Sequence, residues 1–245
     1  MRLRLDQLLL ARGLVQSRAR AADLIKRGAV VVDGALGSKP GQLVRDGADV
    51  AIEPAANAHV ARSGAKLVAA LRHFGLSPAG LAALDVGAST GGFTQVLLEA
   101  GARHVYAVDV GHGQLHADVR SDPRVTNLEG LDARALTPAD VPEPIGAIVA
   151  DVSFIGLARA LPVPLTLAAP ACWLVALVKP QFEAGRGAAD KRGVIRDAET
   201  REQAVVAVEQ WLQSVGWRSL GHIPSPLPGK EGNIEYLVGS LRRDG

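Results

Sequence analysis

The sequence predicts an α/β domain with a mostly parallel β-sheet, preceded by a small basic module of mixed α and β structure. Three observations support this. From residue 80 onward, apolar runs typical of buried strands alternate with helical stretches. The first of these strands runs into a glycine-rich bend. Positive charge is concentrated in the first 45 residues.

The composition indicates a compact protein with a real core. Of 245 residues, 48% are hydrophobic but only 4% are aromatic, so Ala, Leu and Val must fill the interior. This excludes wholesale disorder, collagen-like repeats and coiled coils. The single cysteine, Cys172, allows neither an internal disulfide nor a Cys-based metal cluster, and the first residues lack the apolar segment of a signal peptide. We therefore expect a cytoplasmic protein.

One uncharged run, residues 160–178, approaches the length of a membrane span. Prolines at 162, 164 and 170 interrupt it. We interpret it as the end of a core helix followed by a buried parallel strand over residues 171–178.

The N-terminal module is strongly basic. Residues 1–45 hold nine Lys and Arg against three Asp, a net charge of +6, whereas the other 200 residues carry a net charge of −4. Clustered Lys and Arg displace counterions from a phosphate backbone, so the module is a candidate polyanion-binding surface. The alternative is a solvated surface without a partner.

Within this module the pattern predicts two helices and a small sheet. An apolar helical face runs from Leu3 to Leu10, and Gly13 can end that helix. Ser17 can cap a second helix over residues 18–25. Residues 28–32 form an apolar strand that enters an Asp-Gly turn, and residues 48–52 form a further short strand.

Five segments of this module resemble the S4 RNA-binding domain. They are Arg4-Leu-Asp6, Ser17-Arg18-Ala19, Lys26-Arg27-Gly28-Ala-Val30, Val32-Asp-Gly34 and Lys39-Pro40. The resemblance implies that residues 1–53 dock on structured RNA, mostly through phosphates and shape. The expected RNA contacts are Arg4, Arg18, Arg20, Lys26, Arg27 and Lys39. Residues 54–61 are the expected linker, and residues 62–245 the second domain.

The second domain is predicted element by element from residue 81. The expected strands are 81–86, 104–110, 124–128, 145–152 and 171–178, and the expected helices are 92–100, 156–169 and 197–215. Residues 217–224 and 233–241 are expected to form a terminal hairpin that completes the sheet.

The bend after the first strand is a candidate nucleotide site. The chain reads Asp85-Val-Gly87-Ala-Ser89-Thr90-Gly91-Gly92-Phe93, and these glycines let a ligand approach the backbone. Asp109 closes the next strand 24 residues after Asp85, where an acid commonly accepts hydrogen bonds from a ribose diol. Asp132, after the third strand, is positioned to meet an adenine amino group. From these residues alone NAD, a flavin and S-adenosylmethionine all remain possible. The alternative for Asp85 and for Asp132 is that the carboxylate merely caps the adjacent turn.

Two charged residues follow buried strands. Asp151 and Lys179 end neighbouring predicted strands, and ligands of open α/β sheets bind beyond such ends. We therefore expect the two side chains to pair near the Gly87 bend. A purely structural salt bridge is the competing explanation, because buried charges need partners in any case.

The glycine-rich motif resembles the first motif of class I methyltransferases of the FtsJ-like group. Lys66, Asp151, Lys179 and Glu235 together resemble the Lys-Asp-Lys-Glu tetrad of ribose 2′-O-methyltransferases. The segments Asp151-Val-Ser-Phe154, Val178-Lys179-Pro180-Gln-Phe182-Glu183 and Gly232-Asn-Ile-Glu235-Tyr236 resemble the TlyA, or haemolysin A, family.

This resemblance implies a Rossmann-like fold with a seven-stranded sheet, helices on both faces and a C-terminal hairpin. It also implies S-adenosylmethionine as cofactor, no metal, and cytidines of ribosomal RNA or ribosomal subunits as the target. In the chemistry we expect, Lys179 stabilises or deprotonates the 2′-oxygen and Asp151 positions Lys179. Lys66 adds positive charge or holds a phosphate, and Glu235 anchors a lysine or the hydroxyl.

Three other functions fit the sequence less well. An RNA-binding protein with a vestigial nucleotide fold is disfavoured by the intact acidic residues of the motif. A membrane-damaging toxin, suggested by the haemolysin name, lacks a secretion signal and an amphipathic basic helix with aromatic anchors. An NAD-linked oxidoreductase is disfavoured by the altered glycine spacing and the basic N-terminal module.

Overall fold

The computed structural model describes residues 2–15, 17–26, 29–37, 39–52, 60–61, 63–185, 187–229 and 232–242. The chain divides into two compact units, Met1–Ala65 and Lys66–Gly245, here called the N-terminal and C-terminal units. Each is described by itself. Of the expected linker 54–61, residues 54–59 lie outside the described residues.

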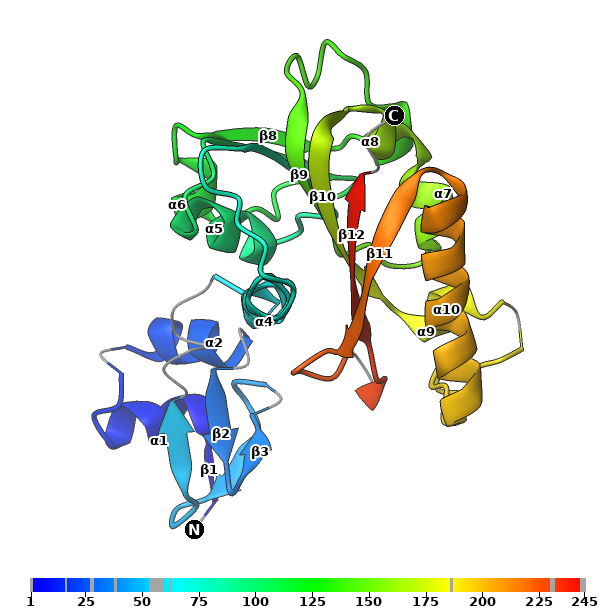
Figure 1. Ribbon diagram of the computed structural model, residues 1–245. Coiled ribbons are helices and arrows are strands. Elements are labelled where there is room, and N and C mark those ends of the chain that lie inside the picture. Colours follow the sequence, from blue (N-terminus) through cyan, green and yellow to red (C-terminus); the bar gives the residue numbers. More distant parts are fainter. Residues whose placement is uncertain are drawn as a thin grey trace. The chain divides into compact units, whose positions relative to one another are not determined.

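The N-terminal unit combines two helices with short strands (Figure 1). Its elements are β1 (Arg2–Arg4), α1 (Leu5–Ala11), α2 (Arg18–Lys26), β2 (Val30–Val32), β3 (Ala35–Leu36), β4 (Leu43–Arg45) and β5 (Val50–Ile52). Strand β1 pairs with β4, and β2 lies between β3 and β5. The predicted Asp-Gly turn joins β2 to β3, with positive φ at both Asp33 (49°) and Gly34 (79°), as a tight hairpin requires. Leu5, Leu8, Leu9, Leu24 and Ile25 form its core.

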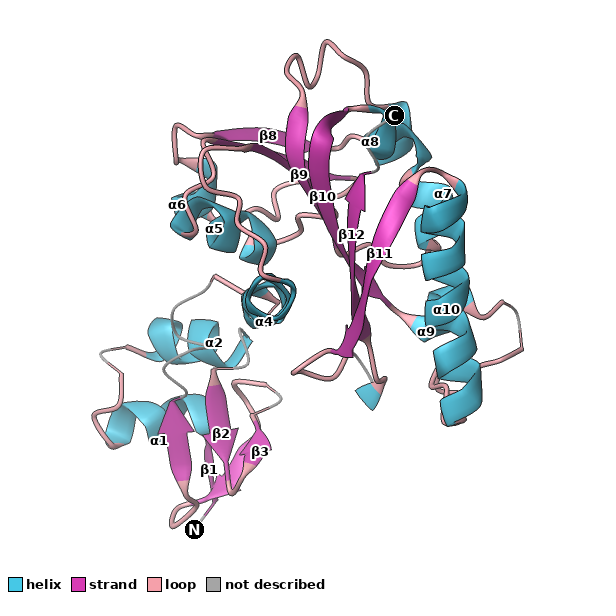
Figure 2. Ribbon diagram, viewed as in Figure 1, coloured by secondary structure: helices cyan, strands magenta, loops and turns pink. Residues whose placement is uncertain are grey.

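The C-terminal unit is built on a seven-stranded sheet (Figure 2). Its strands are β6 (Ala82–Val86), β7 (His104–Asp109), β8 (Val125–Glu129), β9 (Ile145–Ala150), β10 (Ala168–Val178), β11 (Trp217–Pro224) and β12 (Tyr236–Arg242). The order across the sheet is β11-β12-β10-β9-β6-β7-β8. Strands β6 to β10 run parallel to one another, and β12 lies antiparallel between β10 and β11. The predicted fold, including the terminal antiparallel pair, is confirmed.

Helices cover both faces of this sheet. They are α4 (Gly64–Phe74), α5 (Gly92–Glu99), α6 (Ala117–Arg120), α7 (Leu157–Ala160), α8 (Pro162–Thr166), α9 (Pro180–Glu183), α10 (Ala198–Ser214) and the 3-10 turn η1 (Ala133–Ala135). Alternate residues of β6 divide between two cores: Leu84 packs with residues of α7, α8 and α10, and Ala83 packs with residues of α4 and α5. The sheet is therefore packed against a hydrophobic core on each of its two faces.

Three predictions need correction in detail. Leu3, expected on the apolar face of the first helix, lies in strand β1, and that helix begins only at Leu5. The single helix expected over 156–169 is two short helices, because Pro162 starts a new helix in α8. Strand β10 begins at Ala168 rather than at 171, with a register shift before Trp173. Among the described residues, no helix is long and apolar enough to cross a membrane.

Candidate active site

The bend after β6 has the conformation that its glycines allow. Gly87 and Gly91 have positive φ values of 85° and 92°, and Gly91 precedes the first turn of α5. A Cβ on Gly87 would lie 2.6 Å from the carbonyl oxygen of Asp151. The bend thus packs directly against the end of β9, and no larger residue fits there.

Asp85 is buried next to this bend, and one of its carboxylate oxygens has no hydrogen-bond partner among the described residues. Thr94 Oγ1 donates a hydrogen bond of 2.7 Å to Oδ2, whereas Oδ1 has no partner among the described residues. Burial raises the pKa of Asp85 to about 7. A buried acceptor without a partner is rare and points to a donor that the chain itself does not supply.

Asp109 is tied to the same bend. Its carboxylate accepts the backbone N–H of Ser89 at 2.8 Å and that of Gly111 at 2.7 Å. Each carboxylate oxygen can accept more than one hydrogen bond, so Asp109 still has capacity for a diol. The next residue, Val110, has an exposed apolar side chain (67%) that no sequence motif marks as a ligand contact.

The other predicted cofactor residues differ in what they present. Ser89 and Thr90 are exposed on the bend, and Gly92 is buried at the start of α5. The side chain of Phe93 lies in the hydrophobic core, so only its backbone is available to a ligand. The carboxylate of Asp132 caps η1 and forms an ion pair of 2.6 Å with Arg134, which corresponds to the local capping alternative.

Asp151 and Lys179 form the ion pair expected at the ends of β9 and β10. The Nζ–Oδ1 distance is 2.7 Å, and both side chains are largely buried. Lys179 Nζ also donates a hydrogen bond of 2.7 Å to Ser153 Oγ, a residue that the sequence did not single out. An ammonium group has three donors. One of these donors is used by Ser153, and the ion pair keeps the ammonium group against the Asp151 carboxylate, so a further N–H is left to contact a ligand.

Lys66 and Glu235 form a second ion pair beside the first. Lys66 Nζ lies 2.5 Å from Glu235 Oε2, and their side chains are 6% and 3% exposed. The antiparallel register pairs Val178 with Tyr236, so Lys179 and Glu235 are neighbours across β10 and β12. The structure therefore brings all four residues of the tetrad to one edge of the sheet.

An exposed aromatic residue stands next to these ion pairs. Phe154 follows Asp151 by three residues, is 86% exposed and has a φ of 68°. Such a backbone conformation is unfavourable for a bulky side chain and is often found at functional sites. Its ring lies 5.3 Å from that of Phe182, on the segment that follows Lys179. Ile234, beside Glu235, is a further exposed apolar residue.

A half-buried carboxylate links the two segments that bear these rings. Glu183 accepts a hydrogen bond of 2.9 Å from the backbone N–H of Leu157, at the start of α7. Desolvation raises the pKa of Glu183. The sequence marks Phe154, Phe182 and Glu183 only as parts of family-like segments, because exposure and cross-segment contact depend on the path of each loop.

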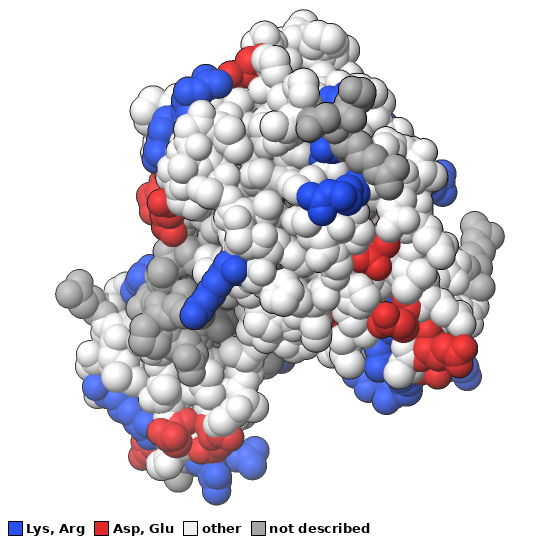
Figure 3. All heavy atoms as spheres, in the orientation of Figure 1, with Lys and Arg blue, Asp and Glu red and all other residues white. Residues whose placement is uncertain are grey.

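The predicted RNA contacts of the N-terminal unit are partly engaged with acids. Arg4 and Arg18 both form ion pairs with the buried Asp6, at 3.1 and 2.9 Å. The hydrogen bond from Arg4 is the main reason why the pKa of Asp6 falls to about 2. Figure 3 shows both basic and acidic side chains on the visible face of this unit.

The remaining four expected RNA contacts are less defined. Arg20 and Lys39 are exposed. The side chain of Lys26 and the whole of Arg27 lie outside the described residues. Arg12, which was not a predicted contact, is occupied by the carbonyl oxygens of Asp46 and Ala48. Several of the basic side chains behind the net charge of +6 are therefore already bound within the unit, and fewer of them are available to contact RNA.

Comparison with known proteins agrees with both units. The FtsJ-like methyltransferase model matches residues 59–242, and the S4 domain model matches residues 3–50. The 16S/23S rRNA (cytidine-2′-O)-methyltransferase TlyA of Mycobacterium tuberculosis is 47% identical over 238 residues, which cover 97% of this chain and 89% of the relative. Hemolysin A of Brachyspira hyodysenteriae is 37% identical over 96% of this chain and 98% of its own length.

A solved structure resembles the whole chain. It is described as a hemolysin from Streptococcus thermophilus, is 37% identical and superposes with a TM-score of 0.78, covering 100% of this chain and 90% of that one. The FtsJ-like model spans the seven-stranded sheet of the C-terminal unit. The chain belongs to the FtsJ-like methyltransferase family and carries an S4 domain ahead of its methyltransferase domain.

Proposed function

We propose that this chain transfers a methyl group from S-adenosylmethionine to the ribose 2′-oxygen of a cytidine in ribosomal RNA. The observation that carries the proposal is the pair of adjoining ion pairs, Asp151–Lys179 and Lys66–Glu235, beside the Gly87 bend. Two relatives, at 47% and 36% identity, are named as rRNA cytidine-2′-O-methyltransferases, which supports the choice of substrate.

The residues around the bend fit S-adenosylmethionine. Asp85 offers an unpartnered buried oxygen, and Gly87 keeps the backbone free of side-chain bulk. Asp109 has acceptor capacity for the ribose hydroxyls, and Val110 offers an exposed apolar surface for the flat adenine. When bound, this group supplies a methyl carried on positively charged sulfur, which is already activated for transfer.

The chain's own task is to prepare the nucleophile. A ribose hydroxyl ionises far above neutral pH, so negative charge that develops on its oxygen needs stabilisation. Lys179 Nζ donates a hydrogen bond to Ser153 and is held against the Asp151 carboxylate by the ion pair, which leaves a donor of the ammonium group for the 2′-oxygen. Because that geometry is set before the substrate arrives, little reorganisation is required during the reaction.

Lys66 and Glu235 would supply the second charged wall of the site. Both side chains are almost fully buried, and a buried ion pair is rarely kept for stability alone. We assign Lys66 to the target ribose or its phosphate, and Glu235 to holding Lys66 in place.

The exposed Phe154 ring fits a nucleobase. Bases that are unpaired and turned out of an RNA helix commonly stack on aromatic side chains. The ring is backed by Phe182 and lies three residues from Asp151, so a stacked base would bring its own ribose near Lys179. Stacking of this kind is worth about 1–3 kcal/mol per base.

The experiment is methylation of ribosomal RNA by the purified chain, with mass spectrometric mapping of 2′-O-methylcytidine. Naked 16S and 23S RNA and isolated subunits are offered separately. We expect one or a few modified cytidines and no base methylation. RNA and S-adenosylmethionine binding without any transfer to these substrates would contradict the proposal and favour a non-catalytic RNA-binding protein.

A further inference from the structure

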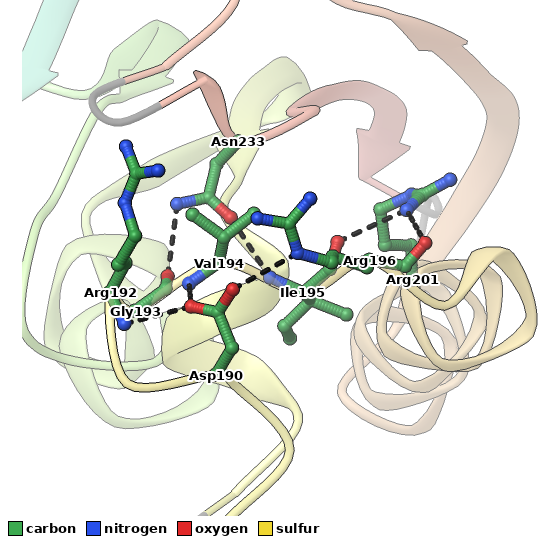
Figure 4. A network of polar contacts seen from close by, with 8 residues as sticks. All are labelled: Asp190, Arg192, Gly193, Val194, Ile195, Arg196, Arg201 and Asn233. Carbon is green, nitrogen blue, oxygen red and sulfur yellow. Dashed lines mark hydrogen bonds and ion pairs between the residues drawn. The ribbon is translucent and has the colours of Figure 1, made fainter.

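A buried asparagine outside the two ion pairs joins two segments of the C-terminal unit (Figure 4). Asn233 is 4% exposed. Its Oδ1 accepts a hydrogen bond of 3.2 Å from the backbone N–H of Ile195, and its Nδ2 donates one of 3.0 Å to the carbonyl oxygen of Gly193. The side-chain amide thus pairs with the 193–195 backbone as a peptide group would. Aspartate, of the same size, lacks the donor for this contact.

The backbone segment bound by Asn233, residues 190–196, is held by hydrogen bonds of its own. The carboxylate of Asp190 accepts the backbone N–H groups of Arg192 at 2.8 Å and Val194 at 3.0 Å, and it also binds Arg196 Nε at 3.1 Å. Figure 4 shows these bonds closing a small loop around Asp190.

The far end of this loop is fastened to α10. Arg201 Nη1 donates hydrogen bonds to the carbonyl oxygens of Ile195 (3.0 Å) and Arg196 (2.7 Å). Asn233 is therefore bonded to a loop that is held at both ends and cannot shift without breaking several hydrogen bonds.

Toward the site, Asn233 lies two residues before Glu235. Its carbonyl oxygen accepts the N–H of Gly229 at 2.8 Å, and that of Glu235 accepts the N–H of Ser225 at 2.8 Å. A Cβ on Gly229 would clash with the Glu235 carboxylate, so this segment wraps closely around it. The path of residues 232–235 decides where the carboxylate meets Lys66.

We propose that Asn233 is a positioning residue that holds Glu235 against Lys66 by anchoring residues 232–235 to the loop 190–196. The inference rests on the proposed function, in which Lys66 takes part in methyl transfer. Without the anchor the buried pair would separate or rotate, and the charged wall that Lys66 and Glu235 form would lose its geometry.

The test is a double-mutant cycle with Asn233→Asp and Lys66→Met. Turnover is normalised to the amount of S-adenosylmethionine bound, so that loss of folded protein is not counted as loss of rate. For Asn233→Asp alone we expect kcat to fall about tenfold, the equivalent of one hydrogen bond, with an unchanged KM for RNA. In the Lys66→Met background the same change should reduce kcat less than about twofold, because sites that act through one contact are not additive.

A tenfold loss in both backgrounds, or no loss in either, would overturn the inference. If Lys66→Met itself keeps native turnover, Lys66 has no role in methyl transfer, and the inference about Asn233 is wrong for that reason. This outcome differs from additive losses in the cycle, which would leave the role of Lys66 intact and reject only the coupling to Asn233. Asn233→Ser, which removes both bonds without adding charge, serves in the same cycle if Asn233→Asp does not bind S-adenosylmethionine. Asp190→Asn keeps the turn acceptor and is the control, with kcat within about twofold of the parent.

Discussion

At the scale of single residues, the site contrasts paired charges with one unpaired carboxyl. Asp151, Lys179, Lys66 and Glu235 neutralise one another in pairs. Asp85 has only Thr94 as a side-chain donor, and its second oxygen faces no partner among the described residues. A buried carboxylate without a partner lowers the stability of the folded protein when it is charged. A ligand that donates a hydrogen bond to it can restore that stability on binding.

We expect Asp85 to make the free protein less stable as the pH rises. Burial raises the pKa of Asp85 to about 7 in the folded state, against about 3.9 for an unfolded chain. Between these values the native state holds the proton more tightly, so the free energy of unfolding decreases from about pH 4 to about pH 7. Asp85→Asn should remove this component, at about 1.4 kcal/mol per pKa unit.

Urea unfolding of parent and Asp85→Asn across that range measures the difference. Subtracting the two curves cancels the acid-side contributions of Asp6 and Glu129, whose pKa values are lowered. Parallel curves would show that Asp85 does not titrate there. The variant should also bind S-adenosylmethionine more weakly.

Residues at strand ends were predictable, whereas residues on loops were not. Asp85, Asp151 and Lys179 each terminate an apolar run, which fixes their place at one edge of a parallel sheet. Ser153 and Phe154 lie on irregular backbone, so neither the contact with Lys179 nor the 86% exposure follows from a pattern.

At the scale of elements, the segments after β9 and β10 act as one wall of the site. Phe154 contacts Phe182, and Glu183 accepts a bond from Leu157, so the two segments meet at two points. The helix prediction over 156–169 failed because Pro162 starts a separate helix, a local proline signal that the helical periodicity alone does not take into account.

Phe154→Gly and Phe154→Ala separate strain from function. Both remove the stacking surface, so we expect the KM for RNA to rise about tenfold or more with unchanged S-adenosylmethionine affinity. Glycine adopts the φ of 68° without cost, so Phe154→Gly should be more stable than Phe154→Ala by about 1 kcal/mol. Steady-state kinetics and thermal unfolding check the two effects. Native KM values in both variants would contradict the base-stacking role.

We expect activity to depend on the hydrogen-bond acceptor of Glu183 more than on its negative charge. Glu183→Gln keeps an acceptor for the Leu157 N–H and avoids burying a carboxylate, so kcat/KM should stay within about twofold of the parent. Glu183→Ala leaves that N–H unpaired and should lower kcat/KM by about tenfold. If the two variants lose activity equally, the hydrogen bond is not what aligns the wall.

At the scale of the whole molecule, the sequence pattern predicts two units of different charge, and the chain divides at residues 65 and 66. The mostly parallel sheet covered by helices follows from strand and helix alternation, whereas the order of the strands was not predicted. The ion pairing of Arg4 and Arg18 with Asp6 was not foreseen, because the short strand β1 and the two helices bring together residues whose contact no local pattern encodes.

Removal of residues 1–53 should weaken RNA binding while S-adenosylmethionine binding persists. Fewer phosphate contacts release fewer counterions, so the plot of log affinity against log salt should become shallower by about 0.7–0.9 for each lost contact. Fluorescence titration at several salt concentrations measures this slope. An unchanged slope would show that the N-terminal unit does not grip phosphates.

The most direct test of the central claim is single-turnover methyl transfer by Lys179→Ala, with S-adenosylmethionine binding measured on the same preparation. Lys179 is joined to Asp151 and Ser153 at the end of β10, outside the residues proposed to hold the cofactor. The account predicts native cofactor affinity and a loss of at least about a hundredfold in the transfer rate. Transfer near the native rate would contradict it, because the 2′-oxygen would then be activated without this ammonium group.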